Sequence, residues 1–80
     1  MRKQAKQIEL TLSTEEVVGK SGGSKIEIII DGNQVVKSVK VDDAIVGDRK
    51  EIARHIREAL EDLNKKHKKM LQSKFGSMMG

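Results

Sequence analysis

An alternating run of isoleucines, followed by a turn and a run of valines, most constrains the fold of this chain. In the segment 25–31, isoleucine occupies every second position, and β-branched residues at period two indicate a strand with one apolar face. The dipeptide Asp31-Gly32 follows, which is typical of tight hairpin turns because glycine adopts positive φ at little steric cost. We therefore predict an antiparallel hairpin whose return strand covers 34–41. The predicted return strand places Val35, Val39 and Val41 on its apolar face and Val36, Ser38 and Lys40 on the other.

Helical patterns flank this hairpin on both sides. Residues 1–13 are rich in helix formers, with apolar residues at spacings of three and four, which predicts a short amphipathic helix. A longer helix is predicted over 48–73, because Asp48 and Glu51 have the capping-box spacing and a stripe of apolar residues follows. At about 39 Å this helix is longer than strands of about 20–27 Å. Its C-terminal third is therefore expected to project beyond the sheet.

Together these elements predict an α+β fold with a short N-terminal helix, a three-stranded antiparallel sheet and a long C-terminal helix. Val17 and Val18 supply the third strand, and glycines and serines indicate a mobile loop at 20–24. We expect residues 1–75 to form a single domain, followed by a flexible tail at 76–80.

The chain is small for the apolar surface that it carries. With 80 residues and no cysteine, it has no disulfide to stabilise it. One sheet and one helix cannot bury the isoleucine face, the valine face and the whole apolar stripe of the long helix. The sequence therefore predicts a two-fold symmetric homodimer. No apolar run reaches the length of a membrane span, and no apolar stretch follows the basic N-terminus, so we expect a cytoplasmic protein without membrane contact.

Basic residues gather at the two ends of the chain. The net charge is +4, yet residues 1–6 and 64–74 contain no acidic residue at all. Such asymmetry is typical of proteins that bind polyanions. Charge alone leaves open the alternative that these lysines only confer solubility. The two clusters comprise Arg2, Lys3 and Lys6 at one end, and Lys65, Lys66, Lys68, Lys69 and Lys74 at the other.

The sequence does not support nucleotide binding, metal binding or catalysis. Gly19-Lys20-Ser21 resembles the end of a phosphate-binding loop, but the earlier glycine is replaced by Thr14 and the segment leads into a strand. His55 and His67 lie about 18 Å apart along one predicted helix, so they cannot share a metal ion within one chain. His55 is interpreted as a packed or capping histidine. We therefore expect no catalytic residue, no metal, no cofactor and no small-molecule substrate, and predict that the chain is not an enzyme.

The composition also distinguishes between single-stranded and double-stranded nucleic acid as a ligand. Phe75 is the only aromatic residue of the FWY type, whereas single strands and looped RNA are bound by stacking on aromatic side chains. Double-stranded DNA bound through its phosphates remains compatible with lysines on helices.

The order of these elements is similar to that of a known family. The stretch Glu16-Val17-Val18-Gly19-Lys20-Ser21-Gly22-Gly23 resembles the E-V-x-G-x-[SA]-G-x-G signature of the YbaB/EbfC family of bacterial nucleoid-associated proteins. A strand ending in Asp31-Gly32, a valine-rich return strand and a long helix with an acidic cap follow in the same order. The resemblance covers about residues 14–75.

This resemblance implies an intertwined homodimer that binds duplex DNA in the nucleoid. It also implies that the N-terminal and C-terminal helices contact the DNA. The alternative is a protein-interaction adaptor, such as an accessory factor in recombination or replication, whose lysines serve solubility. The residues that the resemblance assigns to DNA are Arg2, Lys3, Lys6, Lys65, Lys66, Lys68 and Lys69.

Overall fold

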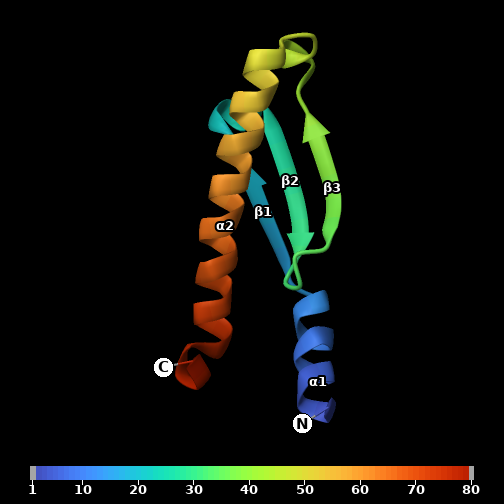
Figure 1. Ribbon diagram of the computed structural model, residues 1–80, viewed down its shortest axis with the longest axis vertical. Coiled ribbons are helices and arrows are strands. Elements are labelled where there is room, and N and C mark those ends of the chain that lie inside the picture. The colour runs from blue at the N-terminus through green and yellow to red at the C-terminus, as the bar shows by residue number, and fades with distance from the viewer. Residues whose placement is uncertain (1, 80) are drawn as a thin grey trace.

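The computed structural model describes the backbone of residues 2–79 and the side chains of residues 6–76. Two helices and three strands follow one another along the chain, with a single 3-10 turn after β1 and another after β3 (Figure 1). The α+β class, the short first helix, the three-stranded antiparallel sheet and the long last helix are as predicted. The elements are α1 (Arg2–Ser13), β1 (Glu16–Lys20), η1 (Gly22–Ser24), β2 (Ile26–Asp31), β3 (Val36–Val41), η2 (Asp43–Ile45) and α2 (Arg49–Met79).

The sheet has the strand order β1-β2-β3, with both pairs antiparallel. A tight turn forms at Asp31-Gly32 as predicted, since the backbone N–H of Gln34 donates to the Asp31 carbonyl at 3.0 Å. The connection is longer than expected, because β3 begins at Val36 and not at residue 34. The Asp31 side chain organises this longer turn: its Oδ1 accepts hydrogen bonds from the backbone N–H of Asn33 and of Val35. The positive φ falls at Gln34, at 69°, rather than at Gly32.

A register irregularity between Ile29 and Ile30 changes which valines share the apolar face. Ile30 pairs with Val36, so Val36 joins Val39 and Val41 on the face of the isoleucines. The prediction had placed Val35 there and Val36 on the opposite face, because strict alternation does not allow for an extra residue in one strand.

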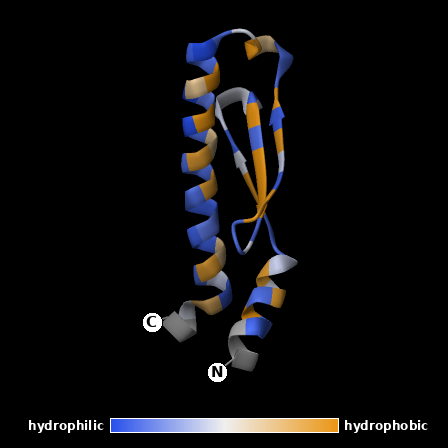
Figure 2. Ribbon diagram, turned by 45° about the vertical axis from the view of Figure 1, so that its right-hand side comes forward, coloured by the Kyte–Doolittle hydropathy of each residue, from blue (hydrophilic) through white to orange (hydrophobic). Residues whose placement is uncertain are grey.

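The core lies between the sheet and α2. This helix packs on β1 and β2 and leaves β3 uncovered, and Figure 2 shows the hydrophobic stripe of α2 turned toward the sheet. Because β3 has no helix over it, Val36, Val39 and Val41 remain 59%, 55% and 43% exposed. The buried core consists of Val17, Ile26, Ile28, Ile30, Ile45, Ala59 and Leu63.

The long helix begins where the sequence predicts and ends later. Asp48 caps it, since its Oδ1 accepts a hydrogen bond from the backbone N–H of Glu51. The helix continues to Met79 instead of ending near residue 73. The flexible tail expected at 76–80 is thus helical as far as Met79, and Gly80 lies outside the described residues. With 31 residues, α2 is about 46 Å long and projects beyond the sheet as predicted (Figure 1).

Candidate nucleic-acid interface

The two predicted basic clusters lie at the same end of the molecule. Figure 1 shows that α1 and the C-terminal part of α2 both extend beyond the sheet on the side where the chain begins and ends. Lys6 is exposed on α1. Arg2 and Lys3 belong to the same helix, but their side chains lie outside the described residues. The topology therefore places at one end of the molecule two segments that are about sixty positions apart in the sequence.

Three of the four predicted lysines on α2 are available to a ligand. Lys65, Lys68 and Lys69 are exposed, and among the described residues none of the three forms an ion pair. Consecutive helical positions are about 100° apart, so these three side chains spread over the outer surface of the helix. This arrangement suits contact with a strand of phosphates.

Lys66 has a different role from its neighbours. Its Nζ donates a hydrogen bond to the backbone carbonyl of Val18 at 3.1 Å and lies 2.8 Å from Oδ2 of Asp62. The side chain thus connects α2 to the outer edge of β1. Lys74 is also engaged, in an ion pair with Glu15 at the end of α1. Spacing along the helix could not distinguish these two lysines from the others, because their partners are distant in the sequence.

Side chains of α2 also occupy the free edge of β1. Asp62 Oδ2 accepts a hydrogen bond from the backbone N–H of Lys20 at 2.9 Å, and Glu58 Oε1 accepts one from Gly22 at 3.0 Å. Asp62 and Lys66 thus satisfy two backbone groups of β1 that an edge strand otherwise exposes, and Glu58 binds the 3-10 turn that follows the strand. The edge of β1 is therefore capped, and the open edge of the sheet is that of β3.

The hydrogen bond from Lys66, and then that from the Lys20 backbone, lower the pKa of Asp62 below its usual value of 3.8. A carboxylate with a lowered pKa stabilises the fold above its ordinary pKa and loses that effect as the pH falls through the lowered value. We expect Asp62→Asn to reduce the free energy of unfolding by about 0.5–1 kcal/mol at pH 7, and the difference from wild type to disappear toward pH 2. Urea unfolding between pH 2 and pH 7 measures this. Asp43→Asn, at an exposed carboxylate on η2, serves as the control, and a difference that persists at pH 2 contradicts the prediction.

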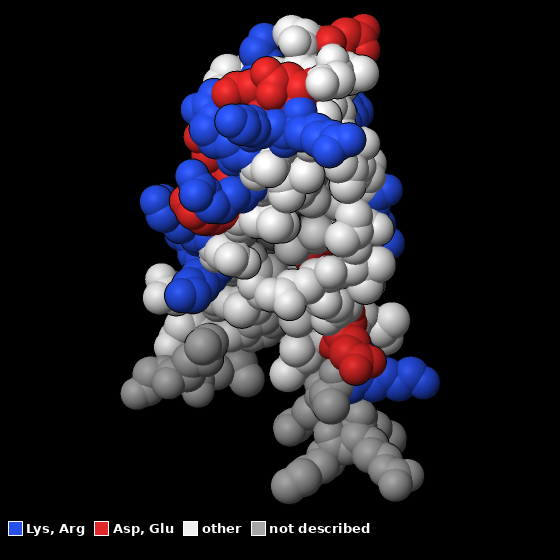
Figure 3. All heavy atoms as spheres, turned by 45° about the horizontal axis from the view of Figure 1, so that its top comes forward, with Lys and Arg blue, Asp and Glu red and all other residues white. Residues whose placement is uncertain are grey.

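Further cations lie on the outer side of α2 that sequence reasoning had not assigned. Lys50, Arg54 and Arg57 line a shallow depression beside Ala53, and Figure 3 shows Lys and Arg gathered along this helix with acidic side chains between them. Arg54 contacts the carboxylates of two glutamates and Arg57 that of another. Charge in this half of the helix is thus largely balanced, unlike that of the C-terminal lysines.

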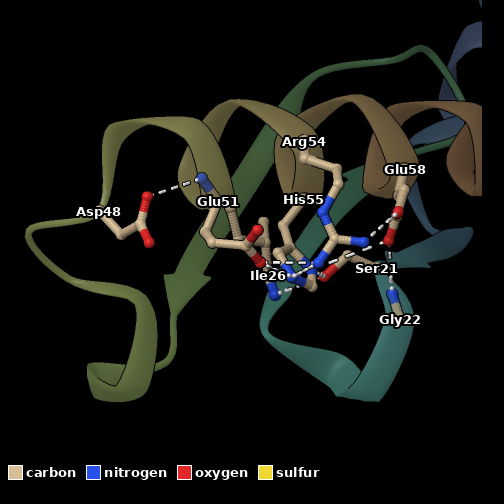
Figure 4. A network of polar contacts seen from close by, with 8 residues as sticks. All are labelled: Ser21, Gly22, Ile26, Asp48, Glu51, Arg54, His55 and Glu58. Carbon is tan, nitrogen blue, oxygen red and sulfur yellow. Dashed lines mark hydrogen bonds and ion pairs between the residues drawn. The ribbon is translucent and has the colours of Figure 1, made fainter.

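A buried polar network joins η1 to α2 (Figure 4). Ser21 Oγ accepts a hydrogen bond from the backbone N–H of Ile26 and lies 2.8 Å from Nδ1 of His55. Glu51 Oε2 lies 3.4 Å from Nε2 of the same ring, and a hydrogen bond from Arg54 lowers the Glu51 pKa. His55 and Ser21 are each only 5% exposed. His55 is therefore a packed histidine, as predicted, and it fixes the loop that follows β1.

Within the described residues, no group of three or more His, Cys, Asp or Glu side chains is placed to hold a metal ion. No helix in that part of the chain is long and apolar enough to cross a membrane.

Comparisons with known proteins agree with this geometry. The fold is similar to a crystal structure of an uncharacterized protein from Helicobacter pylori, with a TM-score of 0.81, 22% identity, and coverage of 99% of this chain and 85% of that one. A nucleoid-associated protein of Hahella chejuensis is 35% identical over 68 residues, which are 84% of this chain and 63% of that relative. The model of the YbaB/EbfC DNA-binding family matches residues 1–80. The chain therefore belongs to the YbaB/EbfC DNA-binding family.

Proposed function

We propose that this protein binds duplex DNA in the nucleoid with low sequence specificity, as a homodimer, through the basic ends of α1 and α2. The observation that carries the proposal is that α1 and the C-terminal half of α2, which bear the two clusters, lie toward the same end of the molecule (Figure 1). Lys6 on α1 and the exposed lysines of α2 lie on helices that extend past the sheet. Family membership gives the same ligand class.

The chemistry of the clusters favours phosphates over bases. The planar groups of arginine, asparagine and glutamine read base edges best, whereas the exposed cluster on α2 consists of Lys65, Lys68 and Lys69. An ammonium group binds a phosphate as a point charge. Binding is therefore expected to depend steeply on salt and weakly on sequence.

The homodimer is supported by apolar surface that a single chain leaves exposed. Asp62 contacts β1 and Glu58 contacts the turn just after it. Leu60 lies about 200° from Asp62 around the helix. Leu60 and Ile56 therefore face the other flank of α2, toward β3. Both are more than 40% exposed. Val36, Val39 and Val41 of β3 are also exposed, on the sheet face against which α2 packs, and an exposed apolar surface of this kind marks an interaction site. We name it the apolar band: Val36, Val39, Val41, Ile56 and Leu60.

A triple variant tests DNA binding. We expect Lys65→Gln, Lys68→Gln and Lys69→Gln together to weaken binding to random duplex at least tenfold at about 150 mM salt, about equally on every sequence. Lysine and glutamine have similar helix propensity, and Lys66 is left in place to keep the β1 edge capped. If the wild-type dimer contacts four to six phosphates, the slope of log affinity against log salt concentration is about −3.6 to −5.4. We expect the slope of the triple variant to be smaller in magnitude. Fluorescence anisotropy over a salt series measures both quantities.

The matched control removes the same charge elsewhere. Lys25→Gln, Lys40→Gln and Lys50→Gln change three lysines near the start of β2, the end of β3 and the start of α2, away from the projecting helix ends. We expect this variant to keep most of the wild-type affinity. If the α2 variant binds as tightly as wild type, the lysines serve solubility and the adaptor function takes the place of the proposal.

A further inference from the structure

The turn between β2 and β3 touches both helices that carry the basic clusters. The backbone N–H of Gly32 donates a hydrogen bond to the carbonyl of Leu12 in α1 at 2.8 Å. The carbonyl oxygen of the same residue lies 2.9 Å from Nε2 of His67 in α2. One glycine thus bonds to α1 with its N–H and to α2 with its carbonyl group. We call this arrangement the Gly32–His67 bridge.

The residues next to Gly32 reinforce the same connection. Asn33 donates from its side-chain amide to the carbonyl of Glu9 in α1 at 2.9 Å. Gln34 lies 3.4 Å from Nδ1 of His67. Because a carbonyl oxygen can only accept, Nε2 of His67 carries the proton and donates to Gly32. His67 is 9% exposed although it lies between Lys66 and Lys68, so it faces the fold and not the ligand.

Apart from the ion pair between Lys74 and Glu15 just after α1, little else fixes the direction of α1. Leu12 is buried, but Ile8 and Leu10 are 37% and 61% exposed, and Figure 1 shows α1 continuing past the end of the sheet. A Cβ atom at position 32 would lie 2.6 Å from the Leu12 carbonyl oxygen and 2.9 Å from its side chain. Any residue other than glycine must therefore push α1 away from the turn. The need for glycine here is one of space, since its φ is not positive.

We infer that the Gly32–His67 bridge sets the distance between the two basic helix ends, and that Gly32 and His67 are positioning residues for duplex binding. The inference rests on the proposed function, because it assumes that both helix ends contact one duplex. Contacts to a regular row of phosphates require a fixed spacing of the cations. The bridge supplies that spacing without touching the DNA.

Distance measurements between spin labels test the bridge directly. The chain contains no cysteine, so Gln7→Cys on α1 and Gln72→Cys on α2 give two unique labelling sites, both exposed. Labelled protein is mixed with excess unlabelled protein so that distances within one chain dominate. We expect a narrow distance distribution in the parent protein. Gly32→Ala and His67→Leu should shift or broaden it and weaken duplex binding at least tenfold.

The conservative variant separates positioning from general damage to the fold. Glutamine can place an amide N–H near the position of the histidine Nε2, so His67→Gln is expected to restore the narrow distribution and most of the affinity. The pair His67→Leu and His67→Gln keeps the test valid if Gly32→Ala does not fold. An unchanged distance in His67→Leu, or a changed distance with unchanged affinity, overturns the inference. If the parent protein binds no duplex, the proposed function is wrong, and the distances still show whether the bridge positions α1.

Discussion

Replacing Gly19 with alanine is expected to lower the free energy of unfolding by about 3 kcal/mol. Gly19 lies in β1 where α2 crosses it, and a Cβ atom there would lie 2.4 Å from the Ala59 carbonyl oxygen and 2.7 Å from Cβ of Leu63. The first of these atoms belongs to the helix backbone, so the whole of α2 must retreat from the sheet. Overpacking of this kind costs about 1–3 kcal/mol or more, and for a domain of this size a loss of about 3 kcal/mol lowers Tm by about 12–24 °C.

The same substitution at another glycine serves as the control. Gly76 lies inside α2, and a Cβ atom there meets nothing within 4 Å. Alanine is favoured over glycine in helices by up to about 1 kcal/mol, so Gly76→Ala is expected to be neutral or stabilising. Thermal unfolding followed by circular dichroism measures both variants. A Gly19→Ala protein as stable as wild type would show that α2 and β1 do not lie as close as described.

A glutamate at Leu60 is expected to convert the proposed dimer into monomers. Leu60 lies in the apolar band and is 45% exposed in the single chain. Fully burying a leucine side chain contributes about 1.5–3 kcal/mol, of which the exposed part of Leu60 supplies about 0.7–1.4 kcal/mol, and two-fold symmetry applies this loss in both subunits. The dissociation constant should therefore rise by at least about 10–100-fold. Light scattering at tens of micromolar is expected to give twice 8.9 kDa for the wild type and 8.9 kDa for Leu60→Glu.

Val46→Glu introduces the same charge outside the apolar band. Val46 is 64% exposed and lies between η2 and α2. We expect this variant to keep the mass of the wild type. A wild-type particle of 8.9 kDa would contradict the homodimer itself, and a dimeric Leu60→Glu would place its interface elsewhere.

The fold could be predicted where local patterns determine it. Alternating isoleucines define β2, and the Asp48 cap with its following stripe defines the start of α2, because both signals depend only on neighbours in the sequence. The turn after β2 could not be predicted in detail. Its geometry depends on the Asp31 carboxylate and on the approach of Leu12 to Gly32, and neither is visible in a dipeptide.

In the candidate site, too, the sequence predicts what depends on neighbouring residues and not what depends on distant ones. Charge counting located the lysines of α2, since basic residues without nearby acids are a local signal. It could not separate Lys66 from Lys65, because Lys66 is held by Val18, forty-eight positions away. The role of His67 could not be predicted either, because its partner Gly32 is brought to it only by the packing of α2 on the sheet.

The capped edge of β1 has a consequence for how copies of this chain can assemble. A sheet with two open edges can add strands on either side without limit, which leads to fibres. Here Lys66 and Asp62 occupy one edge, and only β3 can pair with strands of another chain. Each chain can therefore pair its sheet with that of only one other chain. Two chains that join along β3 form a closed six-stranded unit with no edge left for a third.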